Sequence, residues 1–192
     1  MERDFVGETY DRIDVKENPL VKGDYEGCKF TSCDLSNSDL SEIKFIDCEF
    51  TGCNVSLAKL SKTVFRDVRF VSCKMLGLLF YHCSEFGLSF GFDHCNLGHS
   101  SFYKTKIKKT VFKNSQLEEV DFTDCDLASS SFDHCNLAQA RFENTILEKA
   151  DFRTSYNYSI DPEINRIKRA KFSLNHVTGL LHKYDIEIDR TK

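Results

Sequence analysis

The feature that most constrains this chain is a large apolar residue at every fifth position. The series runs without a gap from Tyr25 to Phe80 and again from Phe92 to Phe152. The phenylalanines that we expect to form its core ladder are Phe30, Phe45, Phe50, Phe65, Phe70, Phe102, Phe112, Phe122, Phe132, Phe142 and Phe152. A period of five fits neither an α-helix nor the alternation of an ordinary strand. The chain is therefore built from a repeating five-residue unit.

A second column, of mostly small residues, lies two positions before the first. The residue between the two columns is often Asp or Asn. Cys33-Asp34-Leu35-Ser36-Asn37 and Ala150-Asp151-Phe152-Arg153-Thr154 both read small, acidic, large, polar, polar. Two inward side chains per unit suit a narrow interior, and the other three positions suit solvent.

This pattern resembles the pentapeptide-repeat family, whose unit is summarised as A(D/N)Lxx. The resemblance covers residues 24–155. It implies an all-β fold, a right-handed quadrilateral β-helix in which each unit forms one side of a square coil and four units complete a turn. Coils stacked at the strand spacing of about 4.8 Å would form a rod on the order of 30 Å long.

The chain divides into three parts. We predict an N-terminal cap over residues 1–23, the solenoid over 24–155 and a C-terminal helical cap and dimerisation tail over 156–192. The frame breaks at about residues 81–91, where two extra residues precede Phe92. The break predicts either a tolerated bulge or a protruding contact loop.

The C-terminal part changes character. Asp161-Pro162-Glu163 predicts a helix start, with an N-cap, a proline at the first position and an acid in the first turn. The alternation from Tyr184 to Ile188 predicts a short strand. The tail resembles that of the gyrase-protecting members of the family, which dimerise through such a module. The residues that would form the dimer interface here are Val177, Leu180, Leu181, Tyr184, Ile186 and Ile188. The alternative is that the tail only caps its own chain.

Nine cysteines raise the hypotheses of a metal site, disulfides or a nucleophile. Eight of them fall in the small inward column, where free cysteine behaves as a small buried apolar residue. Cysteines five residues apart lie on different sides of a square coil and do not converge as zinc ligands must. In His94-Cys95 and its counterparts the two side chains diverge, which argues against a thiol–imidazole pair. We predict free structural thiols, with no catalytic residue, no metal and no cofactor.

Charge and hydropathy predict the cellular location of the protein. The charged start, Met1-Glu2-Arg3-Asp4, lacks an apolar signal region. No apolar run approaches the roughly 18 residues that a membrane span requires. These features predict a cytoplasmic protein with no membrane partner.

Residues 114–152 carry nine acidic and two basic side chains, a net charge of −7. The gyrase-protecting relatives are thought to imitate duplex DNA with a negatively charged rod. The residues to which that role transfers here are Glu118, Asp121, Asp124, Asp126 and Asp133. An acidic rod repels phosphate, so direct nucleic-acid binding is not expected.

A lysine band interrupts this acidic character. It consists of Lys104, Lys106, Lys108, Lys109 and Lys113. The band is either a solvated ring on one coil or a site for an acidic partner.

Two functional hypotheses follow. The first is a homodimeric, non-catalytic protein that imitates DNA, binds a type II topoisomerase such as DNA gyrase and protects it from an inhibitor. The alternative is a pentapeptide-repeat scaffold that binds some other protein and has no topoisomerase role. One scaffold can carry many surfaces, so the surface must distinguish them.

Overall fold

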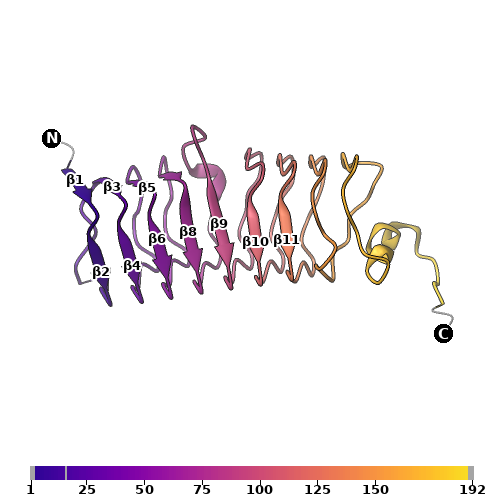
Figure 1. Ribbon diagram of the computed structural model, residues 1–192, viewed down its shortest axis with the longest axis horizontal. Helices are drawn as coiled ribbons and strands as arrows, with labels where there is room; N and C mark the ends of the chain where they lie inside the picture. The colour runs from indigo at the N-terminus through magenta and orange to yellow at the C-terminus, as the bar shows by residue number, and fades with distance from the viewer. Residues whose placement is uncertain (1–2, 16, 190–192) are drawn as a thin grey trace.

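The chain forms an elongated solenoid. The computed structural model describes residues 3–15 and 17–189. Its coils stack along the long axis, so the chain begins at one end of the rod and finishes at the other (Figure 1). The strands are β1 (Arg3–Val6), β2 (Thr9–Asp11), β3 (Gly23–Glu26), β4 (Lys29–Thr31), β5 (Lys44–Ile46), β6 (Glu49–Thr51), β7 (Val64–Arg66), β8 (Val68–Val71), β9 (Phe90–Asp93), β10 (Val111–Lys113) and β11 (Ser131–Asp133). The helices are the 3₁₀ turns η1 (Phe80–His82), η2 (Val177–Leu180) and η3 (His182–Tyr184). No helix in the described part of the chain is long and apolar enough to cross a membrane.

Four faces surround the interior, and we number them in the order in which the chain visits them. The first face is the sheet β1-β3-β5-β7, continued by the bridges Lys106–Asp126 and Ile146–Arg166. The second face is the sheet β2-β4-β6-β8-β9-β10-β11. The third and fourth faces are held by single bridges such as Asn96–Gln116 and Ser101–Asp121. All of these pairings are parallel.

The register shows how the unit of five generates the square coil. Phe45 pairs with Phe65 and Phe112 pairs with Phe132, an offset of four units. The quadrilateral β-helix is therefore confirmed. The exceptions are the pairings that span the frame break, such as Val68 with Phe90 and Lys74 with Asn96, so the coil between β8 and β9 is two residues longer.

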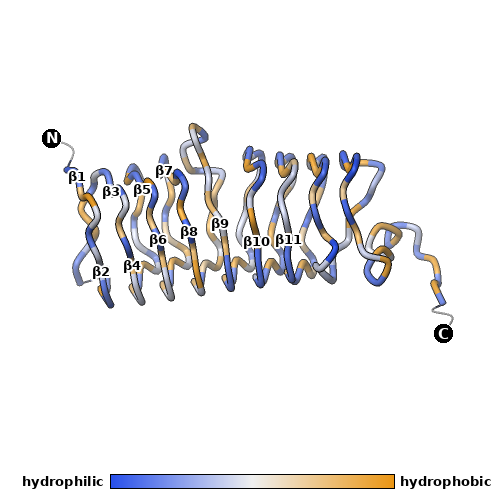
Figure 2. The backbone as a smooth tube through the Cα atoms, viewed as in Figure 1, coloured by the Kyte–Doolittle hydropathy of each residue, from blue (hydrophilic) through white to orange (hydrophobic). Residues whose placement is uncertain are grey.

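The core consists of stacked aromatic columns. Every phenylalanine of the predicted ladder is buried, and the most exposed is Phe142 at 4%. Rings on the same face stack, as for Phe112 and Phe132, whose centroids are 4.9 Å apart and whose planes differ by 5°. Rings on adjacent faces meet edge to face, as for Phe102 and Phe112 at 87°. Hydrophobic and hydrophilic residues consequently alternate along each coil (Figure 2).

The small inward column brings the cysteines into the core. All nine are free and buried. The Cys53 thiol donates to the carbonyl oxygen of Phe30 at 3.3 Å, and several other cysteines repeat this contact. Burial raises the pKa of the Cys125 and Cys135 thiols to about 12, so both remain protonated at neutral pH.

The outward Asp or Asn between the two columns has a structural role in the turn. Asp121 Oδ1 accepts the Thr123 amide at 3.0 Å, and Asp126 Oδ1 accepts the Ala128 amide at 3.2 Å. Such a side chain caps its own turn, which explains the preference for Asp and Asn. The residue two positions after the large one has a left-handed backbone, as at Asp124 with φ of 57°.

The α-helix start predicted at Asp161-Pro162-Glu163 is wrong. Residues 162–164 form a turn, and Asp161 Oδ1 accepts the Glu163 amide at 2.8 Å, as the repeat aspartates do. Arg166 pairs with Ile146, so the solenoid continues past residue 155. Phe172 still stacks on Phe152, with ring centroids 5.3 Å apart.

The tail closes the C-terminal end with η2 and η3. Tyr158 is 1% exposed, and Gly179 lies directly against its carbonyl oxygen and ring. The Ile160 amide donates to the Gly179 carbonyl oxygen at 2.9 Å. The short strand predicted from Tyr184 to Ile188 is wrong, because Tyr184 ends η3 and residues 185–189 carry no strand.

The segment for which the sequence predicts an N-terminal cap contributes a coil of its own. β1 pairs with β3, and β2 pairs with β4, in the common register. Phe5 stacks on Tyr25 at 4.5 Å, and Tyr10 stacks on Phe30 at 4.7 Å. Both outer rings are only half-buried.

Candidate partner-binding surface

The five acidic residues assigned to partner binding do not form one patch. Glu118 lies on the third face, Asp121 on the fourth, Asp126 on the first and Asp133 on the second, while Asp124 occupies the corner after the fourth face. The structure therefore distributes these carboxylates around the circumference of the rod. Acidic residues share a face when they lie four five-residue units apart, and closeness in sequence does not place them together.

Several of these carboxylates already have partners. Asp126 is half-buried and pairs with Lys108 at 3.1 Å. Asp121 accepts the Ser101 hydroxyl at 3.3 Å. Glu118 and Asp124 are exposed. The expectation that outer positions serve only solvent is therefore wrong for Asp121 and Asp126, because both also cap turns.

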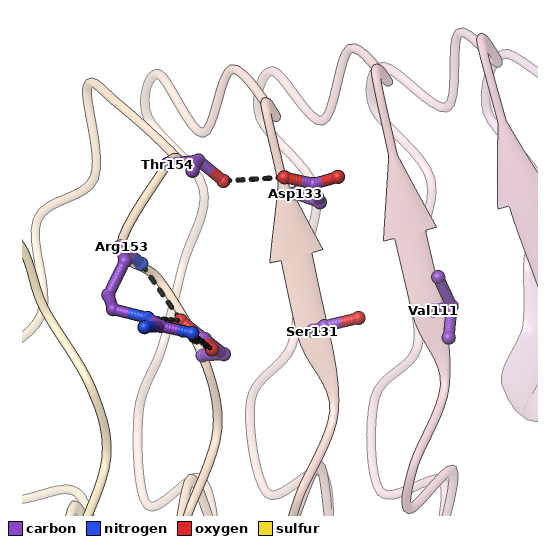
Figure 3. Close-up of a pocket in the computed structure, with 6 residues that line it drawn as sticks. Val111, Ser131, Asp133, Arg153 and Thr154 are labelled. Atoms are coloured by element: carbon purple, nitrogen blue, oxygen red, sulfur yellow. Dashed lines mark hydrogen bonds and ion pairs between the residues drawn. The ribbon is translucent and has the colours of Figure 1, made fainter.

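A shallow recess of about 510 Å³ lies on the second face next to Asp133. The short side chains of Val111 and Ser131 leave space there, and Arg153 folds back beside them (Figure 3). Thr154 Oγ1 donates to Asp133 Oδ1 at 2.8 Å. Arg153 binds Asp151 at 2.7 Å and holds the pKa of that carboxyl below its usual range. The charged side chains that line this recess are therefore largely paired within it.

The frame break forms an outward loop over residues 83–89. It rises above the neighbouring coils between β8 and β9 (Figure 1). Its Phe86 side chain is 81% exposed, and the Arg66 guanidinium lies over the ring at 5.9 Å. Ser89 anchors the base of the loop, since its hydroxyl donates to Asp67 at 3.0 Å and accepts the Asp67 amide at 2.7 Å. The loop presents an aromatic side chain to solvent.

The structure divides the lysine band. Lys104 lies against the Tyr103 ring at 4.8 Å, and Lys113 crosses to the second face, where it pairs with Asp93 at 3.6 Å. Lys106, Lys108 and Lys109 share the first face and its corner. The band is thus not a single surface.

The six residues assigned to a dimer interface differ in exposure. Leu180 packs against the core, and Val177 and Leu181 are half-buried. Tyr184, Ile186 and Ile188 are 50%, 56% and 44% exposed.

Polar contacts tie the tail back to the turn at residues 161–163. Lys183 binds Asp161 at 2.8 Å and Glu163 at 2.6 Å. The Tyr184 hydroxyl donates to Glu163 at 2.9 Å. The apolar side chains of Ile186 and Ile188 lie beyond these ties.

His94 and His134, which precede cysteines, point away from them. His94 pairs with Asp93 at 2.8 Å, and His134 pairs with Asp133 at 2.9 Å, while Cys95 and Cys135 lie in the core. Within residues 3–15 and 17–189, no group of three or more metal-ligating side chains converges.

Comparisons with known proteins agree with this geometry. A family model described as a pentapeptide repeat region matches residues 24–91 and 80–155. The fold is similar to two structures of QnrB1, described as a plasmid-mediated fluoroquinolone resistance protein. A trypsin-treated variant matches with a TM-score of 0.58 at 18% identity, covering 99% of this chain and 100% of that chain. Full-length QnrB1 matches with a TM-score of 0.51 at 17% identity, covering 96% and 100%. No curated protein matches by sequence.

Proposed function

Because the chain belongs to the pentapeptide-repeat family, we propose that it is a non-catalytic protein-interaction rod that binds a type II topoisomerase and protects it from an inhibitor. The observation that carries this proposal is the end-to-end correspondence with QnrB1, which spans 99% of this chain and all of that chain. Fluoroquinolones act on type II topoisomerases, so DNA gyrase is the partner to test first.

The circumferential acids support a DNA-imitating surface. Duplex DNA carries its phosphates around its whole circumference and not on one side. Glu118, Asp121, Asp124, Asp126 and Asp133 likewise occupy all four faces of the rod. They belong to a segment with a net charge of −7, which favours attraction to a basic DNA-binding saddle.

A homodimer through the tail would double this acidic stretch. Tyr184, Ile186 and Ile188 are the exposed apolar residues that would meet across a two-fold axis. We expect Ile186→Asp combined with Ile188→Asp to yield a monomer in sedimentation experiments. Val6→Asp, at the other end of the rod and 68% exposed, is the matched control and should leave the dimer intact. A wild-type protein that sediments as a monomer at micromolar concentration contradicts the dimer.

The function is tested by a supercoiling assay with purified gyrase, with and without a fluoroquinolone. The wild-type protein should restore supercoiling in the presence of the drug. Replacement of Asp121, Asp124, Asp126 and Asp133 by Asn should abolish protection. Asn keeps the acceptor oxygen that caps the turns, so the fold should survive.

The matched control replaces four acidic residues outside the segment 114–152 by their neutral amides, namely Glu26, Glu42, Asp47 and Glu49. It should retain protection, because the same charge is removed from another part of the rod. If the wild-type protein neither binds gyrase at low salt nor alters supercoiling, the topoisomerase proposal is wrong and the scaffold alternative is favoured.

A further inference from the structure

A basic recess lies at the corner between the first and second faces, in the coil that carries the outward loop. Its volume is about 430 Å³. Arg69 lines it from the preceding coil, and Lys108 and Lys109 line it from the following coil. Arg69 and Lys109 are 40 positions apart in sequence, so the folded coils alone bring them to one recess.

Gly91 opens this recess. It occupies the outward position on the second face that Arg69 and Val111 occupy in the adjacent coils. A Cβ atom at residue 91 would meet only the Val111 carbonyl oxygen, at 3.8 Å. The missing side chain therefore leaves a gap between the basic residues above and below.

The charges around the gap favour an anion. Three basic side chains face one carboxylate in the lining, that of Asp67, which is engaged by the Ser89 hydroxyl at 3.0 Å. Two more acids lie nearby, since Lys108 pairs with Asp126 at 3.1 Å and Glu49 neighbours Arg69 in the preceding coil. Arg69 and Lys109 are exposed. The residues that line the recess therefore carry three basic side chains and one carboxylate, and Asp126 and Glu49 contact Lys108 and Arg69 from outside the lining.

An apolar contact is available beside the recess. The loop that carries the exposed Phe86 ends at Ser89, which lines the recess. Arg66 is next to Asp67 in the chain, and its guanidinium lies over the Phe86 ring at 5.9 Å. A ligand that offers both carboxylates and an apolar side chain would therefore engage the whole corner.

We propose that this recess is a docking site for a short acidic segment of a protein. Its carboxylates would pair with Arg69, Lys108 and Lys109, and a neighbouring apolar side chain would pack on Phe86. A nucleic acid is disfavoured because its phosphates would extend over the adjacent residues 114–152, whose net charge is −7. The proposal is independent of the topoisomerase function, since it concerns another surface and a ligand of opposite charge.

Fluorescence anisotropy with the full-length chain tests the site. The probe is a short fluorescein-labelled peptide in which glutamate alternates with leucine. We expect binding that weakens as salt rises, because exposed charge pairs are screened. The combined variant Arg69→Gln, Lys108→Gln, Lys109→Gln should lower the affinity by about tenfold, as expected for the loss of three partly exposed ion pairs.

Two further variants make the test specific. Gly91→Glu should also weaken binding, because it inserts a competing carboxylate into the open gap without removing a basic side chain. The matched control is Lys29→Gln, Lys59→Gln, Lys149→Gln, which removes the same charge at exposed outer positions elsewhere. The control should bind the peptide within about twofold of the wild type. Circular dichroism establishes that each variant keeps its β spectrum.

Three outcomes would overturn the proposal. One is wild-type affinity in the Arg69, Lys108, Lys109 variant. Another is an equal loss in the control variant, which would mean general charge attraction. The third is competition by a single-stranded oligonucleotide as effective as that by unlabelled peptide, which would assign the recess to nucleic acid.

Discussion

The uninterrupted run from Phe92 to Phe152 and the end segment from 156 to 189 share one solenoid but are held together differently. In the run, each contact recurs one coil later, as the stacks of Phe102 on Phe122 at 5.3 Å and Phe122 on Phe142 at 5.1 Å illustrate. In the end segment the contacts are single, such as Gly179 against Tyr158. In the run, the free energy of folding is approximately a sum of equivalent contacts between neighbouring coils, whereas the stability of the end segment depends on individual contacts.

The largest effect is expected from removal of a ring inside the run. Phe122→Ala should cost about 3–5 kcal/mol, because both neighbouring coils would face the resulting cavity. Phe172→Ala should cost about half as much, since Phe172 is only half-buried, stacks on Phe152 and meets Tyr158 at a tilt, with no further coil of the described chain stacked on its other side. Denaturant unfolding of both variants measures the difference. Equal losses would mean that the end segment is as tightly packed as the run.

Gly179→Ala tests the single contact of the end segment. A Cβ atom there would lie 2.3 Å from the Tyr158 carbonyl oxygen, so η2 must shift. We expect a loss of about 1–3 kcal/mol, as for other overpacked sites. Faster protease cleavage within residues 174–189 would show that the tail has undocked.

Gly91→Ala is the control for that variant. Its Cβ would meet only the Val111 carbonyl oxygen at 3.8 Å, so stability should hardly change. A tail that stays protected in Gly179→Ala would mean that residues 177–180 do not depend on this close approach.

A smaller effect is expected from the turn caps of the run. Asp121→Ala removes the acceptor of the Thr123 amide and should cost about 1 kcal/mol, by analogy with the loss of a helix cap. Asp121→Asn keeps the oxygen and should cost much less. Thermal unfolding of the two variants separates the cap from the charge. Equal destabilisation would assign the effect to the lost carboxylate.

The sequence predicts the run far better than the end. Phe102, Phe112 and Phe122 occupy equivalent environments, so the period alone places them in the core. The helix prediction at Asp161 is wrong because a helix N-cap and a turn cap both need a short side-chain acceptor followed by free amides. The pairing of Arg166 with Ile146 distinguishes the two.

The candidate surfaces were predicted less well, for a related reason. A surface patch depends on which residues are four units apart, and the two-residue insertion changes that count. Arg69 aligns with Gly91 only through the longer coil. The recess between Arg69, Lys108 and Lys109 therefore has no sequence motif, although the lysines attract attention as a band.

The smallest expected effect is the pH-dependent docking of the tail. Hydrogen bonds from Lys183 lower the pKa of Asp161 and of Glu163, and each carboxyl has a further donor, the Glu163 amide and the Tyr184 hydroxyl respectively. A lowered pKa in the folded state means that the contribution is present above the unfolded values of about 4 and is lost as pH falls through the folded values. The protection of amides in residues 174–189, measured against the intrinsic exchange rate at each pH, should therefore fall at acidic pH before the run from Phe92 to Phe152 opens. Lys183→Met removes both ion pairs at every pH, so its tail should be weakly protected at neutral pH, and that protection should change little on acidification. A tail that stays protected until the whole rod unfolds would mean that Gly179 and Tyr158, and not these ion pairs, hold the end closed.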